Sequence, residues 1–136
     1  MISVDTNILA RFYLEEDESL QSEKTREQQK IAARLMSKNI LVTRSVMLEF
    51  HWLMKGFYKL PKAIMLDIMD NLPNATVENE DVVVEALGHY KAGLQFADAL
   101  HLAASHDAKE FATFDDQTFA RRAKRLGLKP ICMVPR

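Results

Sequence analysis

The chain has 136 residues, a formal net charge of -1 and an apolar fraction of 48%. This length fits one domain with a single core, and the near-neutral charge excludes a strong global field of either sign. One cysteine excludes an intramolecular disulfide framework, and no apolar run approaches the ~20 residues of a membrane span. We therefore expect one soluble, cytoplasmic domain over residues 1–136, with no membrane association.

The charges are unevenly distributed along the chain. An acidic run, "EEDES", occupies residues 15–19, whereas residues 121–136 carry six basic side chains and no acidic one. Such a basic stretch is compatible with phosphate binding, and a solvated helix face is the alternative. The cysteine, Cys132, lies in the apolar run "ICMV", so we expect a buried thiol.

Short apolar segments alternate with longer amphipathic ones. In chain order, the predicted elements are a strand at 2–4, a helical stretch over 11–39 with a polar break around 15–19, a strand at 40–43, helices over 44–59 and 61–72, a strand at 75–79, helices over 80–93 and 96–108, a strand at 110–114, a helix over 115–127 and a strand at 129–134. This alternation predicts an α/β fold with a parallel sheet covered by helices.

Acidic residues follow two of the predicted strands. Asp5 comes directly after "ISV", and Asp115 and Asp116 come directly after "EFATF". Ligands of open α/β sheets bind at the carboxyl ends of the strands. We therefore expect these acids to project toward the same edge of the sheet.

Two further acids lie in apolar helical stretches. Glu49 is part of "VMLEFHWLM", and Asp98 is part of "LQFADALHLAA". Acidic side chains are rarely buried unless they are paired or bound to a cation. Either acid alone fits the polar side of a helix, but together with the acids at the strand ends they predict a metal site.

Chemistry favours a hard divalent cation at such a site. Converging carboxylates repel each other, and a cation relieves that repulsion. Mg²⁺ and Mn²⁺ prefer oxygen ligands, and they activate a bound water for attack on a phosphodiester. No cluster of cysteine and histidine competes for zinc. His101, three residues after Asp98, is expected to pack or to support the site, with a substrate contact as the alternative.

Several polar and aromatic neighbours have two interpretations. Thr6, Asn7 and Thr113 can satisfy helix starts and strand ends, or orient carboxylates and metal-bound waters. We expect Thr6 and Asn7 to cap the first helix while Asp5 faces the metal. Trp52 is expected in the core, although together with nearby aromatic residues it could instead form an apolar interface.

The motifs occur in a recognisable order. They are "VDTN" at residues 4–7, "SVMLEFHWLM" at 45–54, "FADALHLAAS" at 96–105 and "FATFDDQTFARRAKRLGL" at 111–128. In order, spacing and length, the chain resembles the PIN domain, and within it the small ribonuclease toxins of VapC type. The resemblance implies an α/β/α sandwich around a mainly parallel sheet, and RNA cleavage that depends on Mg²⁺ or Mn²⁺.

The resemblance also implies roles for individual residues. The catalytic acids fall on Asp5, Glu49, Asp98 and Asp115, of which the three aspartates hold one or two ions. Asp116 is left as a helix cap or a ligand of a metal-bound water. Separately, Arg121 and Arg122 are expected to contact the RNA backbone. Relatives of this type usually form homodimers. A small antitoxin protein usually silences such a toxin.

Two other functions use similar features. A catalytically silent PIN module, acting as an RNA-binding or dimerising scaffold, would not need four carboxylates. A phosphatase of the haloacid type would need a second aspartate two residues after Asp5, and "VDTNI" lacks it. A receiver domain would place its acceptor at the end of a middle strand, so both phosphoryl-transfer alternatives fit poorly.

Overall fold

A computed structural model describes residues 1–14, 22–72 and 75–136 of the chain. They form two compact units, Met1–Glu78 and Asn79–Arg136. Within the described ranges, no helix is both long and apolar enough to cross a membrane. The predicted break and acidic run at residues 15–19 lie outside the described residues.

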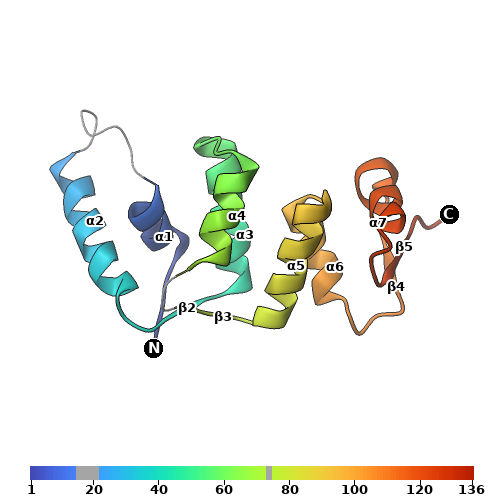
Figure 1. The fold of residues 1–136 in the computed structure, drawn as a ribbon, viewed down its shortest axis with the longest axis horizontal. Coiled ribbons are helices and arrows are strands. Elements are labelled where there is room, and N and C mark those ends of the chain that lie inside the picture. Colours follow the sequence, from blue (N-terminus) through green and yellow to red (C-terminus); the bar gives the residue numbers. More distant parts are fainter. Residues whose placement is uncertain (15–21, 73–74) are drawn as a thin grey trace. The chain divides into compact units, whose positions relative to one another are not determined.

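The described residues of the first unit, 1–14, 22–72 and 75–78, form three parallel strands and four α-helices (Figure 1). Its elements are β1 (Ile2–Ser3), α1 (Thr6–Tyr13), α2 (Glu23–Met36), β2 (Ile40–Val42), α3 (Arg44–Trp52), the π-helical turn η2 (Leu53–Phe57), α4 (Lys62–Asp70) and β3 (Ala75–Val77). The strand order is β1-β2-β3, with Ile2 paired to Ile40 and Ile40 paired to Ala75. The carboxyl ends of β1 and β2 therefore both lead directly into helices, α1 and α3.

Apolar side chains from these helices cover the central strand. Ile40 and Val42 of β2 are completely buried, as are Leu9 of α1 and Phe50 of α3. The start of α3 is fixed by Thr43, whose hydroxyl accepts a hydrogen bond from the backbone N–H of Val46 at 3.3 Å. This cap and the buried face of α3 leave Glu49 on the exposed side of the helix.

Trp52 is not part of the core. Its side chain is 61% exposed, so the expectation that it would be buried is wrong. The helical period explains the outcome, because Met47, Phe50 and Met54 occupy the buried face of the same segment and Trp52 lies between them on the other side. Residues 45–54 are mostly apolar, so composition alone does not distinguish the two faces of this helix.

The second unit contains three α-helices and two strands. Its elements are α5 (Glu80–Ala92), α6 (Phe96–Ala104), β4 (Glu110–Ala112), the π-helical turn η3 (Asp116–Ala120), α7 (Arg121–Arg125) and β5 (Ile131–Met133). The strands β4 and β5 are parallel, with Phe111 paired to Cys132. The predicted buried state of Cys132 is confirmed, since its side chain is 6% exposed.

Aromatic and small apolar residues form the core of this unit. The rings of Tyr90 on α5 and Phe96 on α6 lie 5.7 Å apart, and those of Phe111 and Phe119 lie 5.1 Å apart. Gly93 ends α5 with a φ of 123°, a backbone conformation that residues other than glycine rarely adopt. The turn at Gly93 lets α6 follow immediately and pack along α5.

The predicted elements are found in the described residues, but the strands are shorter and two of the predicted helices contain a π-helical turn, η2 and η3. The strand expected at 75–79 ends at Val77, because Asn79 takes a left-handed conformation with a φ of 49°. The helix expected over 44–59 is interrupted by the π-helical turn η2 before it ends. The expectation of one domain over residues 1–136 stays a prediction.

Candidate active site

Asp5 lies at the junction of β1 and α1, and it caps the helix itself. Its Oδ1 accepts a hydrogen bond from the backbone N–H of Thr6 at 2.7 Å. The expectation that Thr6 and Asn7 would take over this role is wrong, because the carboxylate is already placed beside the free N–H groups of the first turn. Capping uses one carboxylate oxygen, and no described residue donates to the other.

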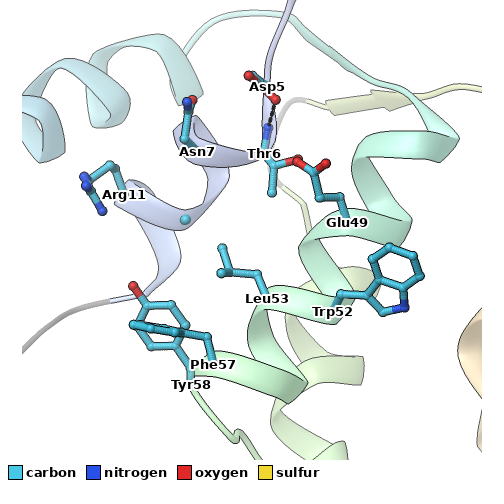
Figure 2. A pocket seen from close by; sticks show the side chains of 10 residues that line it. Asp5, Thr6, Asn7, Arg11, Glu49, Trp52, Leu53, Phe57 and Tyr58 are labelled. Atoms are coloured by element: carbon cyan, nitrogen blue, oxygen red, sulfur yellow. Dashed lines mark hydrogen bonds between the residues drawn. The ribbon is translucent and has the colours of Figure 1, made fainter.

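The first unit brings Asp5 and Glu49 to the wall of one cavity. This cavity has a volume of about 640 Å³ and is open to the surface (Figure 2). Thr6 and Asn7 also line it. The Thr6 side chain is only 5% exposed, and its hydroxyl has no hydrogen-bond partner among the described residues. A buried hydroxyl without a partner is costly, so the cavity wall offers an unused oxygen beside two carboxylates.

In the second unit, the charges of Asp98 and Asp115 interact. Asp98 lies in the first turn of α6 and is half-buried. Burial raises the pKa of Asp98, and the negative charge of Asp115 raises it further. His101 and Arg122 oppose this effect, since their positive charges lower the pKa of Asp98. The pair therefore has the like-charge repulsion that a bound cation relieves.

Asp115 is held by hydrogen bonds on both sides. Its Oδ1 accepts from the backbone N–H of Thr118 at 3.0 Å, and its Oδ2 accepts from the Thr118 hydroxyl. Its own backbone N–H donates to the hydroxyl of Thr113 at 3.1 Å. The bonds from Thr118 are the main cause that lowers the pKa of Asp115, so this carboxylate is kept ionised.

The capping role expected for Asp116 belongs to Asp115. Asp115 occupies the position before η3, whereas Asp116 forms an ion pair with Arg121 at 2.8 Å. The physical reason is geometric, because the Asp115 carboxylate is placed to accept a hydrogen bond from the backbone N–H three residues ahead. Sequence reasoning missed Thr118, whose backbone N–H and hydroxyl both donate to the Asp115 carboxylate.

The two arginines expected at the RNA backbone have different surroundings. Arg121 is exposed and paired with Asp116. Arg122 donates from Nη1 to the carbonyl oxygen of Gly93 at 3.1 Å, and its charge lowers the pKa of both Asp98 and Asp115. Arg122 is thus anchored beside the acids, whereas Arg121 extends into solvent.

The donor atoms of both pairs fit a hard divalent cation. Asp5, Glu49 and the Thr6 hydroxyl offer oxygen atoms only, and so do Asp98 and Asp115. Mg²⁺ and Mn²⁺ prefer such ligands and usually keep several waters. Within either unit, the described residues include no group of three acids, histidines or cysteines arranged to hold a metal ion.

The chain matches one family model over most of its length. The PIN domain model covers residues 2–125, which includes all four acids and parts of both units. The chain belongs to the PIN domain family. This membership confirms the predicted fold class, a three-layer α/β/α arrangement with a parallel sheet. No curated protein matches the sequence.

Family membership indicates a class of reaction and a class of cofactor. PIN domains are usually nucleases, and PIN nucleases generally use divalent metal ions. Asp5 and Asp115 lie where parallel strands lead into helical turns and Asp98 lies in the first turn of α6, as the α/β architecture favours, whereas Glu49 lies in the middle of α3.

Proposed function

We propose that this PIN domain is an endoribonuclease that depends on Mg²⁺ or Mn²⁺ and hydrolyses RNA phosphodiester bonds. The observation that carries the proposal is the pairing of acids that are distant in sequence. Asp5 and Glu49 line one cavity, and the negative charge of Asp115 raises the pKa of Asp98. Family membership supports the same reading, since PIN domains are usually nucleases.

The residues divide the work by their surroundings. Asp5, Asp98 and Asp115 hold one or two ions, and Glu49 completes the site or orients the attacking water. A bound Mg²⁺ or Mn²⁺ supplies an activated water and neutralises charge at the phosphate. Thr113 and Thr118 fix Asp115, and Thr6 offers its hydroxyl to the acidic wall.

Basic side chains hold the backbone of the RNA strand. Arg122 is fixed on the Gly93 carbonyl beside Asp98 and Asp115, which suits a contact to the phosphate being cleaved. Arg121 reaches a neighbouring phosphate when it leaves Asp116. Because arginine presents a planar set of donors, both side chains match the oxygens of a phosphate.

The biological role follows from the resemblance to VapC-type toxins. We infer that the protein is the toxin of a type II toxin–antitoxin pair, acts in the cytoplasm, forms a homodimer and is silenced by a small antitoxin. The "VDTN", "FADALHLAAS" and "FATFDD" motifs support this inference.

A catalytically silent scaffold is the second candidate. The observation that favours it is the occupied state of Asp115, because both of its carboxylate oxygens accept hydrogen bonds from Thr118. In a scaffold, Asp115 would act only as the cap of η3. In a nuclease, these bonds would instead orient the Asp115 carboxylate, and the remaining lone pairs of its oxygen atoms would bind the ion.

Cleavage of a mixed RNA pool in Mn²⁺ separates the two candidates. Asp5→Asn is the sharpest variant, because asparagine caps a helix as well as aspartate and only the charge is lost. We expect its cleavage rate to fall by about 100-fold or more, on the scale of losing one charge-stabilising group. Asp107→Asn is the matched control, since Asp107 is an exposed acid that pairs with His106.

The outcomes are clear-cut. Loss of cleavage in Asp5→Asn, with full cleavage in Asp107→Asn and inhibition by EDTA, supports the nuclease. Equal cleavage by the wild type and Asp5→Asn contradicts the site. A folded wild type that binds RNA and cleaves none in Mn²⁺ supports the scaffold.

A further inference from the structure

The cavity beside Asp5 and Glu49 has an aromatic half that the four-acid site does not use. Trp52, Phe57 and Tyr58 line it, and Figure 2 shows Trp52 on the Glu49 side with Phe57 and Tyr58 on the Arg11 side. Phe57 is 72% exposed and Trp52 is 61% exposed. Two large aromatic side chains in solvent beside acids point to a ligand with an apolar face.

The π-helical turn η2 is what keeps Phe57 out of the core. In a regular α-helix, Phe57 would share a face with Met54 and Phe50, both of which are completely buried. The turn is wider instead, since the backbone N–H of Tyr58 donates to the carbonyl of Leu53 at 3.2 Å, five residues back. Such single π-turns are frequent at functional sites, and this one aims Phe57 at the cavity.

The opposite wall of the cavity is polar and carries the positive charge of an arginine side chain. Arg11 of α1 donates from Nε to the side-chain oxygen of Gln28 at 2.9 Å, which orients its guanidinium at this wall. Asn7 adds an amide to the same wall. The cavity thus combines aromatic faces, a guanidinium and amide hydrogen-bonding groups, all within the first unit.

We propose that this cavity is a nucleobase subsite for an unpaired RNA nucleotide next to the cleaved bond. This inference rests on the proposed nuclease function. The acids and the aromatic residues line the same cavity, so an RNA strand that reaches Asp5 and Glu49 also passes the aromatic residues. The base stacks on the aromatic side chains, Asn7 meets its edge, and Arg11 contacts a phosphate.

Size and charge favour this occupant. The volume of about 640 Å³ lies within the ~300–1,000 Å³ of small-ligand sites, which accommodates a nucleotide. Arg11 complements a phosphate, and base stacking tolerates any base because every base has a flat face. A protein segment is the competing occupant, and the experiment below includes it.

Trp52 provides a direct binding signal, since it is the one tryptophan of the chain. The full-length protein is titrated in EDTA, which prevents metal-dependent cleavage, with short single-stranded RNA and with an abasic oligonucleotide of the same length. We expect the RNA to quench Trp52 fluorescence and the abasic strand to bind about tenfold or more weakly. The salt concentration is held constant, because phosphate contacts depend on it.

Variants at Phe57 test the aromatic contact itself. Phe57→Ala is expected to weaken RNA binding about 5- to 100-fold, and Phe57→Tyr to retain it, with the abasic strand unaffected by either change. Because Phe57 is exposed, both variants keep the fold. Ile64→Ala is the matched control, since Ile64 is a 49% exposed apolar residue on α4 outside the cavity lining, and it leaves binding unchanged.

Each outcome decides the subsite separately from the nuclease. Equal affinity for RNA and the abasic strand, or RNA affinity unchanged in Phe57→Ala, overturns the subsite even when RNA cleavage persists. Quenching by a synthetic Leu- and Arg-rich peptide, with no base-dependent quenching, also overturns it and assigns the cavity to a protein segment. Base-dependent binding through Phe57 in a wild type that cleaves no RNA supports the subsite and refutes the proposed function alone.

Discussion

Asp98 has an unfavourable electrostatic position in the folded chain. Burial and the neighbouring charge of Asp115 both raise its pKa, and the charges of His101 and Arg122 oppose them only in part. A group whose folded pKa lies above its unfolded value destabilises the fold once the pH exceeds both values. Residues in such positions are commonly functional, because selection for stability alone would replace them.

Replacing Asp98 is therefore expected to stabilise the protein while inactivating it. Asp98→Asn removes the charge that burial and Asp115 disfavour. We expect its melting temperature at neutral pH, in EDTA, to rise by about 1–4 °C, while its cleavage of RNA is lost. Differential scanning calorimetry measures the first effect, and a variant that melts below the wild type contradicts this account of Asp98.

His51 gives the fold a pH dependence of its own. Burial lowers the pKa of His51 to about 4, and the positive charge of Lys55 contributes to the shift. Above its ordinary pKa of 6.5, the side chain is neutral in both the folded and the unfolded state. Between these values the unfolded chain binds a proton that the folded chain does not, so stability falls as the pH falls.

This window gives a prediction for denaturation. Between pH 6.5 and about 4, the wild type is expected to lose roughly 2 kcal/mol more unfolding free energy than His51→Gln. Urea denaturation across this range measures both curves. Parallel curves for the two proteins would show that His51 is not kept neutral by burial.

The turn η3 positions an acid through its cap. Thr118 donates to Asp115 from both its backbone N–H and its hydroxyl, so the first residues of the turn hold the carboxylate in one orientation. The same element places Arg121 beside Asp116, on α7 just beyond the turn. A small element thereby fixes the carboxylate of an acid that follows a strand.

Thr118 is expected to act as a positioning residue for metal binding. Thr118→Val removes the hydroxyl and keeps the backbone cap, so we expect about a tenfold lower Mn²⁺ affinity with a change in stability within about 1 kcal/mol. Thr118→Ser restores the hydroxyl and the affinity. Calorimetric titration with Mn²⁺ measures the effect, and equal affinities in the valine and serine variants would contradict it.

Element order and the position of acids just after strands are predictable from this sequence, whereas side-chain roles at helix starts are not. The strand at Ile40, the glycine that ends α5 and the acids after β1 and β4 follow from local patterns. The cap at Asp5 and the exposure of Trp52 depend on backbone geometry and on which helix face packs inward. The π-turn η2 has no sequence signal comparable to a proline or a capping threonine.

The whole chain distributes its acids over two compact units. Met1–Glu78 carries Asp5 and Glu49, Asn79–Arg136 carries Asp98 and Asp115, and the PIN match extends across both. The nuclease proposal requires both pairs to serve one reaction. Groups that act as a unit have non-additive effects on the rate, whereas independent groups have additive ones.

A double-mutant cycle of RNA cleavage in Mn²⁺ tests this requirement most directly. The rates compared are those of the wild type, Asp5→Asn, Asp98→Asn and the double variant, each checked for folding by its thermal transition. The proposal predicts that each single change lowers the rate by about 100-fold or more and that the double change costs little beyond either one. Single variants with the wild-type rate, or losses that multiply in the double variant, would contradict a shared metal-dependent site.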